Sequence, residues 1–222
     1  MGRSGSAWRP RWCCCLRLPP AVHRPCHRHS QSSTGDTADK SRPDYRGVRD
    51  SLTAGQSASP KESYPAQLEQ RLRAAGYAHR VINAGVGGDT TGDGLRRIDT
   101  VLVYRPAIVI VEFGANDGFQ GVPFSQIRAN LAEIIQRLQS ANVRVVLAGM
   151  KLPSNYGPTY TDGLSAVYTD LAGKHDVVLI PFFLEGGAAR PELNHSDGIH
   201  PTAEGYRIIV EHLWLILEPL LG

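Results

Sequence analysis

The sequence predicts an α/β protein of three layers, in which helices cover both faces of a parallel β-sheet. Two observations predict this class. Apolar runs of the length of buried strands alternate along the chain with segments whose apolar residues recur at helical spacing. No internal repeat is visible in this alternation. The 222 residues suit one domain with a sizeable core, whereas two full domains would be cramped.

The expected strands are short and apolar. The clearest is 107–113, which reads AIVIVEF and is apolar almost throughout, as expected for a parallel strand covered on both faces. Glu112 is unusual within such a strand, and the sequence does not show its partner. The same reasoning predicts further strands at 80–84, 143–148 and 177–182.

The expected helices carry apolar residues on one face. In the first, Tyr64, Leu68 and Leu72 fall at helical spacing, and Gly76 is a natural terminator. The strongest helical pattern spans 127–138, for which Ser125 is the expected N-cap. The remaining helices are expected over 95–102, before Pro106, and over 164–171 and 202–217.

Three unusual polar segments lie at 85–91, 114–118 and 195–200. The first two follow predicted strands, and the third precedes the last predicted helix. In parallel α/β sheets, ligands bind beyond the carboxyl ends of the strands. We therefore expect these segments to meet at one mouth of the sheet.

Four sequence blocks lie in and before these segments. They are DSLTAG at 50–55, NAGVGGDTT at 83–91, GAND at 114–117 and DGIHP at 197–201. In this order and spacing they resemble the GDSL/SGNH hydrolases, with most similarity to the bacterial arylesterase and thioesterase/lysophospholipase subgroup. The resemblance covers about residues 50–221. It implies the SGNH hydrolase fold, a flavodoxin-like three-layer sandwich with a parallel sheet of about five strands.

The resemblance also implies a serine esterase that hydrolyses carboxylic esters or thioesters through an acyl-enzyme, with no cofactor and no metal. Ser51 would be the nucleophile and His200 its base, because imidazole titrates near neutral pH. Asp197, three residues earlier, can reach the imidazole and fix its tautomer. The family pattern assigns the oxyanion hole to the backbone N–H groups of Ser51 and Gly88 and to the side-chain amide of Asn116.

Each of these residues also has a simpler interpretation. Ser51 could be a helix N-cap, and Gly88 and Asn116 could belong to turns. Asp197 and His200 could cap the last helix, and together with His195 they could be metal ligands. These interpretations become weaker when all four blocks occur together.

The glycine pattern around Ser51 argues against a different hydrolase fold. The α/β-hydrolase nucleophile elbow needs G-x-S-x-G, and here Arg49 and Thr53 occupy the two glycine positions. A carbohydrate acetyl esterase remains an alternative, because one fold serves many leaving groups.

The first 49 residues differ in composition from the rest. They carry 10 Lys/Arg against 3 Asp/Glu, whereas residues 50–222 carry 14 against 18. All four cysteines lie within residues 13–26, so no disulfide framework is expected in the remainder. We expect 1–43 to be a disordered or spurious segment and 44–222 to be the hydrolase domain. The basic head makes a nucleic-acid binder a further alternative, which we disfavour.

The expected partner is a small-molecule ester or thioester. No apolar run in the sequence is long enough to cross a bilayer, so we expect no stable membrane insertion. Relatives in the subgroup are often periplasmic or secreted, but no signal peptide is readable in this chain. The sequence leaves the localisation and the oligomeric state open.

Residues 44–49 depart from the family pattern. Family members have an apolar strand there that ends in glycine, whereas this chain reads DYRGVR. Unpaired charges in a central strand each cost several kcal/mol, and a domain has only about 5–15 kcal/mol of stability. Our hypothesis is that residues up to about 49 are not the natural head of the domain, through a reading-frame shift or a misplaced start. A catalytically impaired relative with a disrupted first strand is the corresponding alternative.

Overall fold

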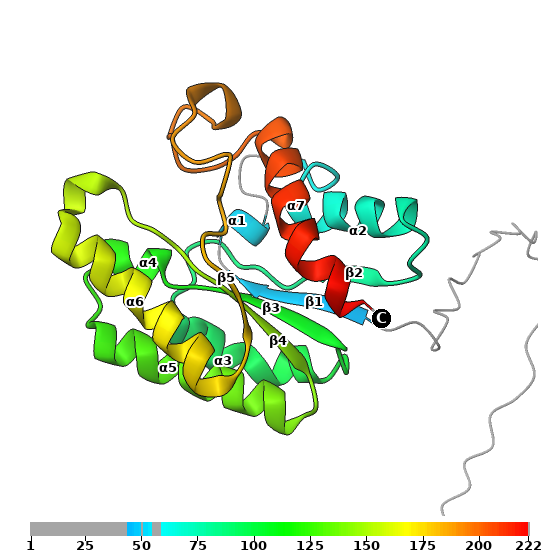
Figure 1. The fold of residues 1–222 in the computed structure, drawn as a ribbon, viewed down its shortest axis with the longest axis horizontal. Helices are drawn as coiled ribbons and strands as arrows, with labels where there is room; N and C mark the ends of the chain where they lie inside the picture. The colour runs from blue at the N-terminus through cyan, green and yellow to red at the C-terminus, as the bar shows by residue number, and fades with distance from the viewer. Residues whose placement is uncertain (1–43, 50, 55–58, 222) are drawn as a thin grey trace, which may run out of the picture. The chain divides into compact units, whose positions relative to one another are not determined.

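The structure, a computed structural model, describes residues 44–49, 51–54 and 59–221. Its five strands form one sheet in the order β2-β1-β3-β4-β5, and every neighbouring pair is parallel (Figure 1). The strands are β1 (Asp44–Arg49), β2 (Arg80–Asn83), β3 (Ile108–Glu112), β4 (Arg144–Ala148) and β5 (Val178–Ile180). The predicted parallel sheet of about five strands is confirmed.

The burial of the strands explains their sequences. All five residues of β3 are buried, and so are all residues of β4 except Arg144. Both strands lie inside the sheet and are covered on two faces, which is why their sequences are apolar runs without alternation. The edge strand β5 has three residues and is shorter than the predicted 177–182.

Helices cover both faces of the sheet (Figure 1). On one face, α2 (Tyr64–Ala74) packs against α7 (Ala203–Leu217). On the other, α5 (Phe124–Ser140) packs against both α3 (Thr91–Leu102) and α6 (Pro158–His175). These five are the helices predicted from apolar spacing. The short elements are α1 (Ser51–Ala54), α4 (Ala115–Phe119), η1 (Ser154–Tyr156), η2 (Pro191–Leu193) and η3 (Glu218–Leu220).

Two local predictions need correction. Ser125 does not cap α5, because that helix begins at Phe124 with Pro123 in the N-cap position. Proline is compatible with a helix start because its missing N–H would have had no helical partner there. The segment 114–118 is not simply a loop, because it contains the single-turn helix α4. A single turn is too short to show a helical period in the sequence.

The unusual segment 44–49 does form the strand that leads to Ser51. Its backbone pairs with β2 on one side and β3 on the other, and Arg49 lies opposite Glu112 in the register. The side chains of this strand lie outside the described part of the chain, and so do residues 1–43 altogether. The prediction for the basic head therefore stays a prediction.

Candidate active site

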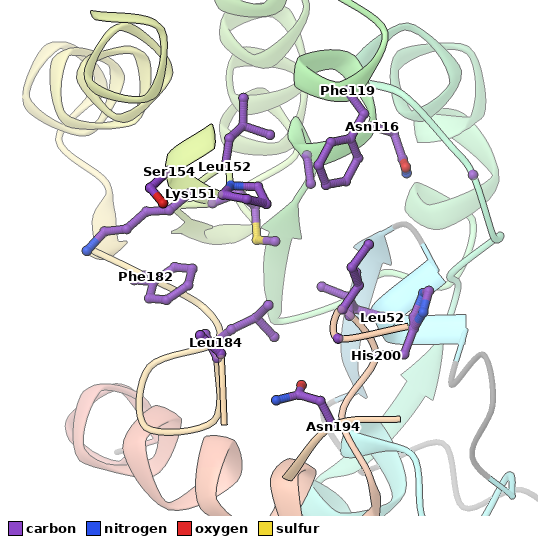
Figure 2. Close-up of a pocket in the computed structure, with 18 residues that line it drawn as sticks. Leu52, Asn116, Phe119, Lys151, Leu152, Ser154, Phe182, Leu184, Asn194 and His200 are labelled. Carbon is purple, nitrogen blue, oxygen red and sulfur yellow. The ribbon is translucent and has the colours of Figure 1, made fainter. Parts of the chain in front are cut away.

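The segments that carry the four sequence blocks meet at one cavity beyond the carboxyl ends of the strands. Its volume is about 580 Å³. Leu52 of α1, Gly88 after β2, Asn116 of α4 and His200 before α7 all line it (Figure 2). The expected meeting of these segments is therefore found in the structure.

His200 and Asp197 form a hydrogen-bonded pair at this cavity. His200 Nδ1 lies 2.7 Å from Asp197 Oδ2. The backbone N–H groups of His200 and Ile199 donate to Asp197 Oδ1 over 3.0 and 2.9 Å. These bonds, led by the one from the His200 backbone, hold the pKa of Asp197 well below its ordinary value. A charged carboxylate at Nδ1 favours the imidazole tautomer that carries its proton there.

The loop that presents this pair is closed by its own backbone. The His195 N–H donates to the His200 carbonyl over 2.8 Å, and the Gly198 N–H donates to the His195 carbonyl over 2.9 Å. Gly198 has φ +69°, a left-handed conformation that glycine adopts without strain. Thr202 then caps α7 by accepting from the Gly205 N–H. The turn that brings the Asp197 side chain to His200 is thus held mainly by hydrogen bonds between residues that are close in the sequence.

Ser51 is the first residue of α1, and its side chain lies outside the described part of the structure. Its neighbour Leu52 lines the cavity and is almost fully buried. The hydroxyl of Tyr206, on α7, donates to the Leu52 carbonyl over 2.8 Å in a buried hydrogen bond. The turn that carries Ser51 is therefore attached to the last helix, 154 residues away in the sequence.

Thr53 attaches the same turn to two strands. Its hydroxyl donates to Glu112 Oε2 over 3.1 Å, and both side chains are completely buried. The side-chain amide of Asn83, at the end of β2, donates to the Thr53 carbonyl over 2.7 Å. This contact gives Glu112, the unexplained charge of the apolar strand, a role in holding α1.

Gly88 and Asn116, two of the three residues predicted for the oxyanion hole, both line the cavity. Gly88 has φ +84°, which favours glycine in the loop after β2. The side-chain amide of Asn116 donates to the Asp89 carbonyl over 2.9 Å, next to Gly88 in the chain. The bond fixes the amide of Asn116 against the loop that contains Gly88.

A second buried threonine–carboxylate pair supports that loop. Asp117 is almost fully buried and accepts from both the backbone N–H and the hydroxyl of Thr91, over 2.8 and 2.5 Å. The side-chain amide of Asn130, on α5, donates to the Thr91 hydroxyl over 3.0 Å. The loop therefore enters α3 at a position that is set by α4 and α5.

The sequence did not predict either threonine–carboxylate pair. Glu112 was noticed as a charge in an apolar strand, which is the signal that could have identified it as part of the site. Thr53, Thr91 and Asp117 lie within the sequence blocks, but their pairing has no local signal because the bonds join residues that are 26 or more positions apart.

The rest of the cavity wall is mainly apolar. Met150, Leu152, Phe182, Leu184 and Phe119 face it from the segments after β4, β5 and β3 (Figure 2). Such a wall suits a hydrocarbon chain, because binding removes the apolar surfaces of both the wall and the chain from water.

The described residues were also compared with the requirements of a metal site and of a membrane-spanning helix. Within 44–49, 51–54 and 59–221, no three His, Cys, Asp or Glu side chains are arranged to hold a metal ion. In the same part of the chain, no helix has the length and apolar character needed to cross a bilayer.

A histidine–carboxylate pair beside an apolar cavity, at the carboxyl edge of a parallel sheet, is typical of enzymes that work by acid–base chemistry. Comparison with known proteins identifies the family. The model of the GDSL-like lipase/acylhydrolase family matches residues 50–208, and the chain belongs to this family. It is a GDSL-type esterase, which acts on ester bonds.

Relatives that are 36–39% identical to this chain are bacterial enzymes. The chain is 38% identical to "Esterase TesA" of Pseudomonas aeruginosa over 175 residues, which cover 78% of this chain and 87% of that one. It is 36% identical to "Thioesterase 1/protease 1/lysophospholipase L1" of Escherichia coli over 174 residues, or 78% and 82% of the two chains. A crystal structure of TesA superposes with a TM-score of 0.78 at 37% identity, covering 80% of this chain and 99% of that one.

Proposed function

We propose that the protein hydrolyses carboxylic esters or thioesters through an acyl-enzyme, with Ser51 as nucleophile and His200 as base. One observation carries this proposal. The 2.7 Å contact between His200 and Asp197 lies at a cavity that Leu52, the neighbour of Ser51, also lines. A serine hydroxyl needs such a base, because it is a weak nucleophile at neutral pH.

The reaction has two halves. In the first, the Ser51 oxygen attacks the acyl carbonyl while its proton passes to His200 Nε2, and the imidazolium then protonates the leaving alcohol or thiol. In the second, water attacks the acyl-enzyme while His200 takes a proton from it. The imidazolium then returns this proton to the Ser51 oxygen as the bond to the acyl carbon breaks, and the acid is released. Asp197 remains charged throughout and stabilises the imidazolium through Nδ1. This scheme requires no cofactor.

The negative oxygen of the tetrahedral intermediate needs hydrogen-bond donors. We assign this role to the backbone N–H groups of Ser51 and Gly88 and to the side-chain amide of Asn116. The bond from Asn116 to the Asp89 carbonyl supports this assignment, since it holds the amide in one orientation before substrate binds. Loss of one such donor typically costs about 10²–10³ in kcat.

The cavity favours an acyl chain over a single acetyl group. Its volume of about 580 Å³ and its leucine, methionine and phenylalanine wall fit a hydrocarbon chain. The relatives named as a thioesterase and lysophospholipase support the same class of substrate. A carbohydrate acetyl esterase remains the second candidate, and it would prefer acetylated sugars to longer acyl esters.

Two other proposals concern the N-terminal region. We propose that 44–222 is the hydrolase domain and that 1–43 takes no part in catalysis. The charges within 44–49 support the alternative of an impaired first strand, because the family has an apolar strand that ends in glycine there. Restoring an apolar strand at 44–49 would then raise activity.

Hydrolysis of p-nitrophenyl esters over a series of acyl lengths tests the proposed function. We expect the Ser51→Ala variant to lose about 10⁴-fold or more in kcat, with the fold intact by circular dichroism. Equal activity in the variant would contradict the role of Ser51. If the folded wild-type protein is inactive and an apolar 44–49 segment restores hydrolysis, the impaired-strand alternative is correct.

A further inference from the structure

A polar side chain interrupts the apolar wall of the cavity. Asn194 lies just before the loop that presents Asp197 and His200, and it lines the same cavity. It is one of the few polar residues in the described chain that are buried, with 7% of its surface exposed. An isolated bridge to Pro201 fixes its backbone.

The orientation of the Asn194 carboxamide is determined by its bonds. Its nitrogen donates to the carbonyl oxygens of Gly187 and Arg190, each over 2.8 Å. An amide nitrogen has two hydrogens, so both are used. Exchanging the amide nitrogen and oxygen would place the oxygen against two carbonyl oxygens, and that arrangement is repulsive. The amide therefore has a single favourable orientation.

The Asn194 oxygen is consequently directed away from the backbone that holds the nitrogen. Figure 2 shows it pointing into the cavity, which Leu184 and Leu52 also line. Within the described residues, no donor forms a hydrogen bond to this oxygen. The cavity thus contains a hydrogen-bond acceptor that is fixed in place and available to a ligand.

We propose that Asn194 Oδ1 is a specificity determinant that binds a hydroxyl or N–H group on the part of the substrate that fills the cavity. This inference rests on the proposed esterase function and names its substrate class. A plain hydrocarbon chain would displace water from Asn194 Oδ1 and would offer no hydrogen-bond donor to replace it. A chain with a hydroxyl or amide group restores the hydrogen bond, and sites built to bind such a group discriminate against the analogue that lacks it.

The donor could belong to either half of the ester. It could be a hydroxyl or amide on the acyl chain, or a hydroxyl of the leaving alcohol, as in a glycerol or sugar ester. Two substrate series separate these sources. The first is S-ethyl thioesters of octanoic acid and of its hydroxy isomers, in which the hydroxyl lies on different carbons and the thiol carries no donor. The second compares the glyceryl and propyl esters of octanoic acid.

The measurement is kcat/KM for each member of the two series, in wild type and in Asn194→Leu. We expect one hydroxy isomer, or the glyceryl ester, to exceed its plain counterpart by about tenfold, as one hydrogen bond allows. In Asn194→Leu this ratio should fall to about one. Because each ratio compares two substrates of the same preparation, a smaller folded fraction of the variant does not affect it.

Leu184→Met is the matched control, since it changes an apolar residue of the same wall with little change of volume. Its ratios should equal those of wild type. The proposal is overturned if wild type prefers no donor-bearing substrate, or if the preference persists in Asn194→Leu. That failure would leave hydrolysis of the plain octanoyl thioester intact, whereas failure of the proposed function would show as Ser51→Ala retaining this hydrolysis.

Discussion

The two sides of the proposed catalytic centre are held in different ways. The histidine side is closed by bonds between residues 195–200, and the Asp197 side chain is 41% exposed. The serine side depends on hydrogen bonds between α1 and Glu112, Asn83 and Tyr206, which lie in three other elements. The bonds with Glu112 and Tyr206 are buried. One side is thus defined by a short local motif, and the other by the completed fold.

This difference has an energetic consequence. An exposed local loop contributes less to global stability than the buried core does, so changes in it should alter the chemistry far more than the stability. Loss of a buried hydrogen bond costs about 1–3 kcal/mol, because the remaining polar group is not compensated by water. Changes around α1 should therefore lower stability and activity together.

The largest effect is expected for His200→Ala, on the local side. Without its base Ser51 is a poor nucleophile, and kcat should fall by about 10⁴–10⁶-fold. The free energy of unfolding, measured with urea, should change by less than about 1 kcal/mol. A large loss of stability would show that this loop is not energetically separate from the core.

Asp197→Asn should have the next largest effect. Loss of the charge beside Nδ1 removes the preference for the productive tautomer and should lower kcat by about 10³–10⁴-fold. The pH dependence of stability gives a second measurement. Because folding lowers the pKa of Asp197, its stabilising contribution is present above the ordinary value near 4 and is lost as pH falls further.

The Tm difference between wild type and Asp197→Asn should consequently be largest above about pH 4 and become smaller below it. The same Tm difference at pH 3 and pH 7 would contradict the bonding that we describe for this carboxylate.

The smallest change in rate, but the largest in stability, is expected for Thr53→Val on the buried side. Valine matches the shape of threonine but cannot donate to Glu112, so we expect a loss of about 2 kcal/mol in the free energy of unfolding. kcat should fall about tenfold while KM changes little, since α1 carries the nucleophile and only part of the cavity wall. Thr53→Ser keeps the hydroxyl and should recover most of kcat, which a purely steric role for Thr53 would not predict.

The same contrast explains how much could be predicted from the sequence. The strand at 107–113 and the helix at 127–138 follow from apolar spacing, because burial determines which residue types occur there. The contact between Asp197 and His200 could be predicted from the sequence, because one turn of the chain can bring residues three positions apart together. Gly88 and Asn116 were predicted from their blocks, and the structure places both at the cavity.

Other features depend on contacts that no local pattern contains. One partner of Glu112 is a threonine 59 residues away, and this contact follows only from the completed fold. Asn194 gave no signal in the sequence, because its importance lies in which carbonyl groups surround it. The single-turn helices α1 and α4 were missed, since each is shorter than two helical periods.

Labelling with a fluorophosphonate, followed by peptide mass spectrometry, tests the central claim most directly. Serine hydrolases of this mechanism form a stable phosphonyl adduct on the activated serine. We predict one adduct, on Ser51, which is absent in Ser51→Ala and forms far more slowly in His200→Ala. An active enzyme that carries the adduct on another residue, or that labels equally fast without His200, would contradict the assignment of Ser51 and His200.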